Sequence, residues 1–261
     1  MENLEKCPIR EPLIFDSHAH YDDKKFDGIR DELLSKLTEY GVCGVVTCGC
    51  DGESSKEALK LAEKYSYIYA AVGIHPENLK SCTEIEEIEA LAKNQKCVAI
   101  GEIGLDYYWE KENRDAQLEI FEKQLMLAKK LNLPVIVHDR EAHADTLDLL
   151  LKHKPQGVVH CFSGSAEMAR EILKIGMYIG IGGVITFKNA KKLPEALEVI
   201  PSDMLLLETD CPYLAPEPLR SKLCHSAMIG FTAQKVAELK GVSTEEILKI
   251  SKNNAKKLFG I

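Results

Sequence analysis

The chain has 261 residues and a formal net charge of −8, with 45% hydrophobic and 28% charged residues. It contains neither a run of about 18 apolar residues nor an apolar secretory leader, which argues against membrane insertion and export. The acidic balance excludes a protein that coats nucleic acid through bulk positive charge, but it allows an enzyme that binds a few phosphates locally.

Nine cysteines are present, an odd number without any C-x-x-C pair. This pattern favours reduced thiols over a disulfide framework or a zinc ribbon. Together with the missing leader, it predicts a cytoplasmic protein.

Short apolar runs alternate with longer amphipathic segments along the whole chain. The apolar runs are rich in β-branched and aliphatic residues, as expected for strands buried on both faces. Segments 27–40, 54–65 and 116–131 instead carry apolar residues at the helical period. The expected strands are 13–15, 44–47, 68–72, 97–100, 135–137, 157–159, 178–181 and 204–207.

Eight units of strand and helix within about 250 residues predict a (β/α)₈ TIM barrel of parallel strands. An open doubly wound sheet is the alternative, but its first strand usually ends in a glycine-rich phosphate loop. Here the first strand runs into DSHAH at 16–20. No repeat or linker interrupts the pattern, so we expect one barrel domain over residues 1–261.

Polar residues collect at one end of the predicted strands. The carboxyl ends of barrel strands form the face on which barrel active sites are built. Scattered core histidines would have no reason to gather there, so the group predicts one site. Its six members are His18, His20, Glu102, His138, His160 and Asp210.

The spacing of His18 and His20 supports metal binding, because side chains two apart on an extended strand point the same way. Four imidazoles and two carboxylates exceed the needs of one tetrahedral ion and favour two divalent ions. The residue types leave the metal open among zinc, magnesium and manganese.

Six segments resemble the TatD-type metal-dependent deoxyribonucleases, a family of amidohydrolase-like metal barrels. The resemblance runs in order from near Leu13 to the C-terminus and implies a (β/α)₈ barrel, two divalent ions and hydrolysis of phosphodiester bonds in DNA. The segments are DSHAH at 16–20, VGIHP at 72–76, GEIGLDYY at 101–108, VIVHDR at 135–140, VHCFSG at 159–164 and LLETDCPYLAP at 206–216.

The resemblance also implies roles for individual residues. His18, His20 and Asp210 correspond to the ligands of one ion, His138 and His160 to those of the second, and Glu102 to the bridge between them. Asp210 and Glu102 are therefore the expected catalytic residues, with Asp210 orienting the attacking water and accepting its proton.

Substrate contacts are expected beside these ligands. His75 occupies the position of a pocket histidine in the family motif, and Arg140 suits bidentate phosphate binding, although a surface ion pair is the alternative. Ser163 and Arg220 are further candidates. Aromatic side chains next to the ligands are expected either to stack on a base or to pack at the rim; they are Tyr107, Tyr108, Trp109 and Phe162.

One stretch departs from the family pattern. Where the family usually has Arg-Gly-Lys-x-Asn followed by a polar residue and proline, this chain has RSKLCHS from Arg220. The altered loop at 221–226 affects substrate range first, because barrel loops set specificity. We expect His225 to be an exposed loop histidine without a metal role.

These observations predict a metal-dependent deoxyribonuclease acting 3′ to 5′ on single-stranded or frayed DNA, the direction being implied by the resemblance. A hydrolase of an ester or amide, such as an aminoacylated tRNA end, would use the same ligands. A non-catalytic metal or nucleic-acid binding module is the third possibility, against which an open metal site argues. A monomer without an obligate protein partner is the simplest assembly.

Overall fold

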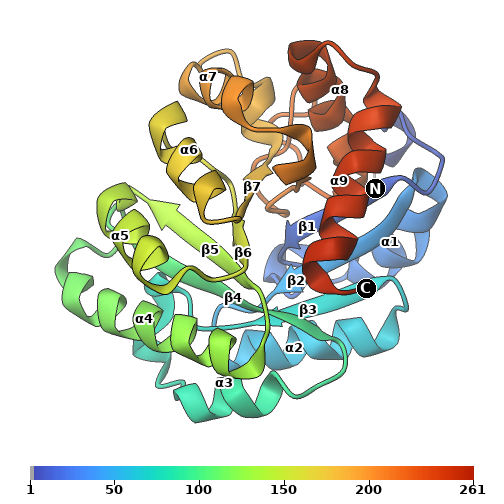
Figure 1. The fold of residues 1–261 in the computed structure, drawn as a ribbon. Helices are drawn as coiled ribbons and strands as arrows, with labels where there is room; N and C mark the ends of the chain where they lie inside the picture. Colours follow the sequence, from blue (N-terminus) through green and yellow to red (C-terminus); the bar gives the residue numbers. More distant parts are fainter. Residues whose placement is uncertain (1–2) are drawn as a thin grey trace.

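The computed structural model describes residues 3–261 and contains one sheet of eight parallel strands in chain order. Helices alternate with the strands and surround them (Figure 1). The sheet closes where Ala19 of the first strand bridges Cys211 after the last. The strands are β1 (Ile14–Ala19), β2 (Val42–Cys48), β3 (Ile68–Val72), β4 (Cys97–Asp106), β5 (Val135–Arg140), β6 (Gly157–Val159), β7 (Tyr178–Ile181) and β8 (Leu205–Leu207).

The architecture is the predicted (β/α)₈ barrel, and the expected helices at 27–40, 54–65 and 116–131 correspond to α1 with a following 3₁₀ turn, α2 and α4. Among the described residues, no helix is both long and apolar enough to cross a membrane. The helices are α1 (Arg30–Lys36), α2 (Gly52–Lys64), α3 (Ile85–Leu91), α4 (Arg114–Leu131), α5 (His143–His153), α6 (Ala166–Lys174), α7 (Lys192–Val199), α8 (Ile229–Lys240) and α9 (Thr244–Phe259).

Three strands extend further toward the site than the apolar pattern indicates. β1 continues to Ala19, β4 to Asp106 and β5 to Arg140, so His18, Glu102 and His138 lie within strands rather than behind them. The apolar runs stop where polar side chains begin to face the barrel interior, whereas the backbone pairing continues. The strand ladder therefore holds these three side chains rigidly.

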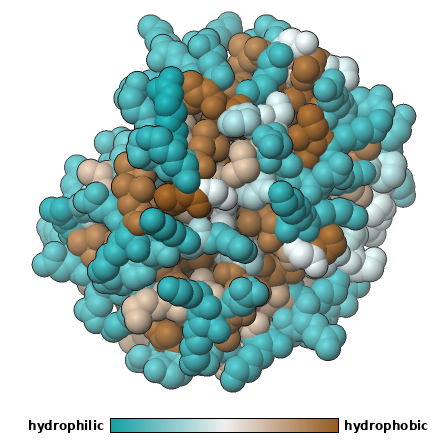
Figure 2. Space-filling view, in the orientation of Figure 1, coloured by the Kyte–Doolittle hydropathy of each residue, from teal (hydrophilic) through white to brown (hydrophobic). Residues whose placement is uncertain are grey.

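The barrel interior is closed at the end opposite the site. A buried cluster there includes Phe15, Val46, Ile136 and Leu206, and Phe259 of α9 packs against it with its ring centroid 6.3 Å from that of Phe15. Hydrophilic residues line most of the outer edge of the face in Figure 2, and hydrophobic residues show toward its middle. Water and substrate can reach the polar cluster only from the carboxyl ends of the strands, because the other end is filled.

Candidate metal centre

The first group of the centre joins the two ends of the sheet. His18 and His20 lie at the end of β1 with their Nε2 atoms 3.0 Å apart, the arrangement of side chains two positions apart on a strand. Asp210 follows β8 and places its Oδ1 3.5 Å from His18 Nε2 and 3.4 Å from His20 Nε2. The backbone N–H of Asp210 donates to the His18 carbonyl, which fixes the loop against β1.

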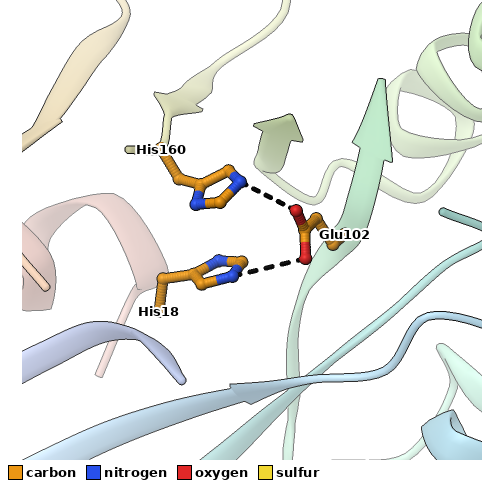
Figure 3. A group of neighbouring side chains, drawn as sticks. All are labelled: His18, Glu102 and His160. Carbon is orange, nitrogen blue, oxygen red and sulfur yellow. Dashed lines mark ion pairs between the residues drawn. The ribbon is translucent and has the colours of Figure 1, made fainter. Parts of the chain in front are cut away.

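Glu102 connects this group to a second one. Its Oε2 lies 3.3 Å from His18 Nε2 and 3.2 Å from His20 Nε2, whereas its Oε1 lies 2.9 Å from His138 Nδ1 and 2.7 Å from His160 Nε2. Figure 3 shows the carboxylate with one oxygen toward His18 and the other toward His160. With His75 Nε2 3.4 Å from Oε1, a single buried carboxylate thus contacts five imidazoles.

A further layer of contacts orients the rings. Asp106 Oδ2 lies 3.1 Å from His138 Nε2, which leaves Nδ1 of that ring directed at Glu102. His20 Nδ1 is 2.9 Å from the carbonyl of Cys48, so its Nε2 faces the cluster. Such partners fix the tautomer of a metal-binding histidine and its ring direction.

His75 contacts the histidine–carboxylate cluster directly. Its Nε2 is 3.4 Å from Glu102 Oε1, and its Nδ1 accepts the backbone N–H of Glu77. His75, Glu102 and His138 form one of the groups with the spacing of metal ligands. The sequence predicted that His75 lies in the pocket; the structure places it in contact with the Glu102 carboxylate.

The charges of the cluster depend on one another. Burial by itself would raise the pKa of Glu102, but His160, His75 and His18 hold that pKa well below its usual range. Burial likewise opposes ionisation of Asp210, yet hydrogen bonds from His18 and His20 keep its pKa below its usual range. Burial, followed by the nearby His18, lowers the pKa of His160 to about 4. Both carboxylates are therefore ionised at neutral pH, and His160 is available as a neutral ligand.

The donor set fits divalent cations. Nitrogen and oxygen atoms bound at about 2.0–2.1 Å to one tetrahedral ion lie ~3.3 Å from each other. The contacts among His18, His20, Asp210 and Glu102 span 3.0 to 3.5 Å, as bound ligands would. Imidazole nitrogens with carboxylate oxygens suit zinc and manganese, and the carboxylates suit magnesium.

Two acids of the centre were missed by sequence reasoning. Glu208 is fully buried beside His160, with its Oε1 3.8 Å from His160 Nδ1, and it accepts the backbone N–H of Cys161. Burial raises the pKa of Glu208 to about 8, so this acid is largely protonated at neutral pH. Asp106, which orients His138, was missed as well. Each acid lies at the end of a strand, β8 or β4, within a segment already recognised as a family motif, and that position was the available signal.

A cavity of about 710 Å³ opens above the cluster. Arg140 and Ser163 line it, and the Arg140 guanidinium stacks over the Tyr108 and Trp109 rings at 4.3 and 5.5 Å. Arg220 is not among the residues that line this cavity, and its guanidinium lies 4.2 Å from the centre of the Phe187 ring.

The aromatic residues divide between rim and core. Trp109 lines the cavity and is 60% exposed, so it can meet a ligand. Phe162 is buried, and the Tyr107 hydroxyl donates to Asp145. Stacking on a base from within the main cavity is thus open to Trp109 and closed to Tyr107.

His225 corrects the expectation of an exposed loop histidine. Its side chain is buried, and neither ring nitrogen has a hydrogen-bond partner among the described residues. The loop is drawn inward because Ser226 donates to Asp16 and is in hydrogen-bonding contact with Tyr21, both deep in the barrel. Burial lowers the pKa of His225 to about 4.

Replacing His225 with phenylalanine should reduce the loss of stability in acid. Because the pKa of His225 in the folded state is near 4, below the usual 6.5, protonation of this residue favours the unfolded chain. Its contribution to the free energy of unfolding is therefore fully present above pH 6.5 and is lost as the pH falls toward 4. At pH 4.5 the wild type should lose about 2–3 kcal/mol of unfolding free energy through this residue. Urea unfolding of both proteins at pH 7.0 and 4.5 measures the difference; equal losses would show that His225 is solvated or paired when folded.

Comparison with known proteins places the chain in a family. The family described as TatD related DNase matches residues 15–260. The chain belongs to this family. TatD relatives match it over nearly their full length: YabD of Bacillus subtilis, described as an uncharacterized metal-dependent hydrolase, is 42% identical over 95% of this chain and 100% of its own.

Two further TatD proteins show the range of the similarity. TatD of Pantoea ananatis, described as a 3′-5′ ssDNA/RNA exonuclease, is 35% identical over 95% of this chain and 100% of its own. The crystal structure of the TatD homologue YJJV from Escherichia coli K12 superimposes with a TM-score of 0.90 at 31% identity, covering 96% of this chain and 99% of that one. This TatD protein is therefore a metal-dependent hydrolase with a TIM-barrel fold.

Removing divalent metal from this TatD protein should lower its melting temperature without unfolding it at 25 °C. An ion present at 100 times its Kd stabilises the folded state by about 2.7 kcal/mol, which for a chain of this size corresponds to roughly 5–10 °C. The fold should persist without the ion, because the eight-stranded sheet and its buried apolar core hold it together. Calorimetry of chelated protein titrated with Mn²⁺, Zn²⁺ or Mg²⁺ measures the shift, and an unchanged midpoint with all three would contradict a metal centre.

Proposed function

We propose that this protein hydrolyses phosphodiester bonds in DNA, removing nucleotides from the 3′ end of single or frayed strands. The observation that carries the proposal is the position of Glu102 at the base of an open cavity. Its two oxygens contact different histidine groups, as a carboxylate shared by two cations would. Nucleases commonly use two ions about 3.5–4 Å apart.

The proposed ligands divide between the two sites. His18, His20 and Asp210 would hold one ion, and His138 and His160 the other, with Glu102 shared. When bound, the ions supply Lewis-acid polarisation of a phosphoryl oxygen and a water of lowered pKa.

The chain's own residues have distinct parts in the proposed reaction. Asp210 is ionised, and its side chain is 21% exposed, compared with 4% for Glu102, which supports Asp210 as the acceptor of a proton from the attacking water. Arg140 on the cavity wall would bind a phosphate oxygen while its guanidinium stays stacked on Tyr108 and Trp109.

A substrate panel tests the proposal. The protein would be assayed with Mg²⁺, Mn²⁺ and Zn²⁺ against end-labelled single-stranded DNA, blunt duplex DNA, single-stranded RNA and aminoacyl-tRNA. We expect single-stranded DNA labelled at its 5′ end to be shortened fastest, from its 3′ end, with release of mononucleotides. Preferential hydrolysis of the aminoacyl ester, or no release of nucleotide with any metal, would overturn the proposal.

A further inference from the structure

A second cavity adjoins the metal centre. Its volume is about 380 Å³, and it shares Cys161 and Ser163, which follow β6, with the main cavity. Its remaining wall comes from the turn after β7 and from the start of α7. A volume of this size falls within the range of small-ligand sites, and the two shared residues put the cavity next to the place where a phosphodiester would be cut.

The walls of this second cavity have two chemical characters. Phe162, Val184 and Leu193 supply an apolar surface, of which Phe162 and Leu193 are buried. Lys191 and Lys192 stand exposed at the edge, and within residues 3–261 neither lysine has an ion-pair partner. An apolar surface beside free cations suits a nucleotide, whose base is flat and apolar and whose phosphate is anionic.

The position of the lysines concentrates positive potential. Lys191 is the N-cap of α7 and Lys192 its first residue, and Lys191 makes no capping hydrogen bond through its side chain. The unpaired backbone N–H groups of a first helical turn already favour anions, and cations there are disfavoured unless an anion is bound.

We propose that the second cavity binds the nucleotide adjacent to the scissile phosphate of a single strand. Its base would lie against Phe162 and Val184, and its phosphate would lie at Lys191 and Lys192. This assignment rests on the proposed function, because it extends a strand whose cleaved phosphate sits in the main cavity. If the second cavity binds this nucleotide, the turn after β7 and the start of α7 determine how strongly the rate depends on the length of the substrate strand.

The test compares two matched pairs of substitutions. Lys191→Gln/Lys192→Gln removes the charges at the second cavity. Lys256→Gln/Lys257→Gln removes an adjacent pair in the last turn of α9, where Phe259 packs against the closed end of the barrel. Each protein is assayed on oligothymidylates of two to eight nucleotides and on bis(p-nitrophenyl) phosphate, which is too short to span both cavities.

The first pair should lower the ratio of kcat/KM on oligothymidylates to kcat/KM on bis(p-nitrophenyl) phosphate about tenfold, mainly through KM. The salt dependence of log KM should fall by about 0.7, since the two lysines contact one phosphate and each phosphate neutralised on a single strand contributes ~0.7. Filling the cavity with Ala190→Leu should lower the same ratio without changing the salt dependence. If Lys191→Gln/Lys192→Gln and Lys256→Gln/Lys257→Gln gave the same ratio of kcat/KM values, the proposal would be overturned.

The two proposals can fail separately. If the wild type hydrolyses neither oligothymidylate nor bis(p-nitrophenyl) phosphate, the proposed function fails. Fluorescence anisotropy with labelled tetrathymidylate in the presence of a chelator then decides the second cavity. Weaker binding by Lys191→Gln/Lys192→Gln than by the α9 pair would support the nucleotide site, and equal binding would refute it.

Discussion

Replacing Glu102 with glutamine should lower hydrolysis at saturating metal by at least about a thousandfold, or ~4 kcal/mol of activation barrier. The reason is its position between the two histidine groups, where its oxygens lie 2.7 to 3.4 Å from five imidazole nitrogens. Glutamine keeps the shape but loses the negative charge that would balance the two cations of the proposed site. Initial rates and elemental analysis after dialysis measure activity and bound metal, and we expect at least one ion to be lost.

Glu77→Gln is the matched control for this substitution. Glu77 also lines the main cavity, but its side chain makes no contact with the histidine cluster among the described residues. The Glu77→Gln substitution tests whether removing any negative charge from the cavity impairs turnover. We expect its hydrolysis rate to change by less than about threefold, under ~0.7 kcal/mol of activation barrier. A Glu102→Gln protein that keeps full metal content and over a tenth of the rate would remove Glu102 from the bridging position.

Replacing Asp210 with asparagine should lower kcat by about 10²- to 10⁴-fold, the usual contribution of a general base. Asp210 is ionised, and its side chain is 21% exposed compared with 4% for Glu102, so Asp210 is the more accessible proton acceptor in the proposed reaction. The amide keeps an oxygen as a weak metal ligand but has little basicity. The measurement is kcat across a metal titration, with circular dichroism and a melting curve to confirm the barrel.

Asp23→Asn provides the control for this second substitution. Asp23 lines the same cavity and accepts a hydrogen bond from Tyr213, away from the histidines. The kcat of the Asp23→Asn protein should stay within a few-fold of the wild-type value. If Asp210→Asn retained more than about a tenth of the wild-type rate, a loss under ~1.4 kcal/mol, Asp210 would have no part in the proton transfer.

The barrel was predictable because its signal is local and repeated. Buried strands are marked by consecutive aliphatic residues, and β3, β6 and β7 begin and end where the pattern indicates. The expected strands at β1, β4 and β5 are too short, because hydrophobicity cannot mark the end of a strand whose last side chains include polar residues. The same limit hid Asp106, which sits at the polar end of β4.

The position of each site residue in the chain was also readable, since parallel strands bring their carboxyl ends to one face. Strand order alone puts the candidate ligands on that face, but it does not establish that one carboxylate contacts both histidine groups. Nor does it establish that His75 reaches Glu102 at 3.4 Å. Those facts depend on side-chain direction across several strands at once. The candidate ligands that share the face are His18, His20, Glu102, His138, His160 and Asp210.

The burial and protonation of residues outside the strands could not be predicted from the sequence, because they depend on tertiary packing. His225 lies in a polar segment that is typical of an exposed loop, yet Ser226 anchors that segment to Asp16 across 210 residues of chain. Glu208 is an ordinary acid by sequence, and full burial beside His160 makes it a protonated one. The second cavity likewise joins residues after β6 to residues before α7.

Periodicity and strand order, both readable in the amino-acid sequence, were sufficient to predict the barrel, the face on which the site lies and the six candidate ligands of the metal centre. The folded chain was needed to establish which atoms of Glu102 meet which histidines, which acids are charged, and that the lysines of α7 border a cavity next to the centre. Such properties depend on burial and on distances of a few ångströms between residues far apart in the chain, and electrostatic interactions change steeply over that range.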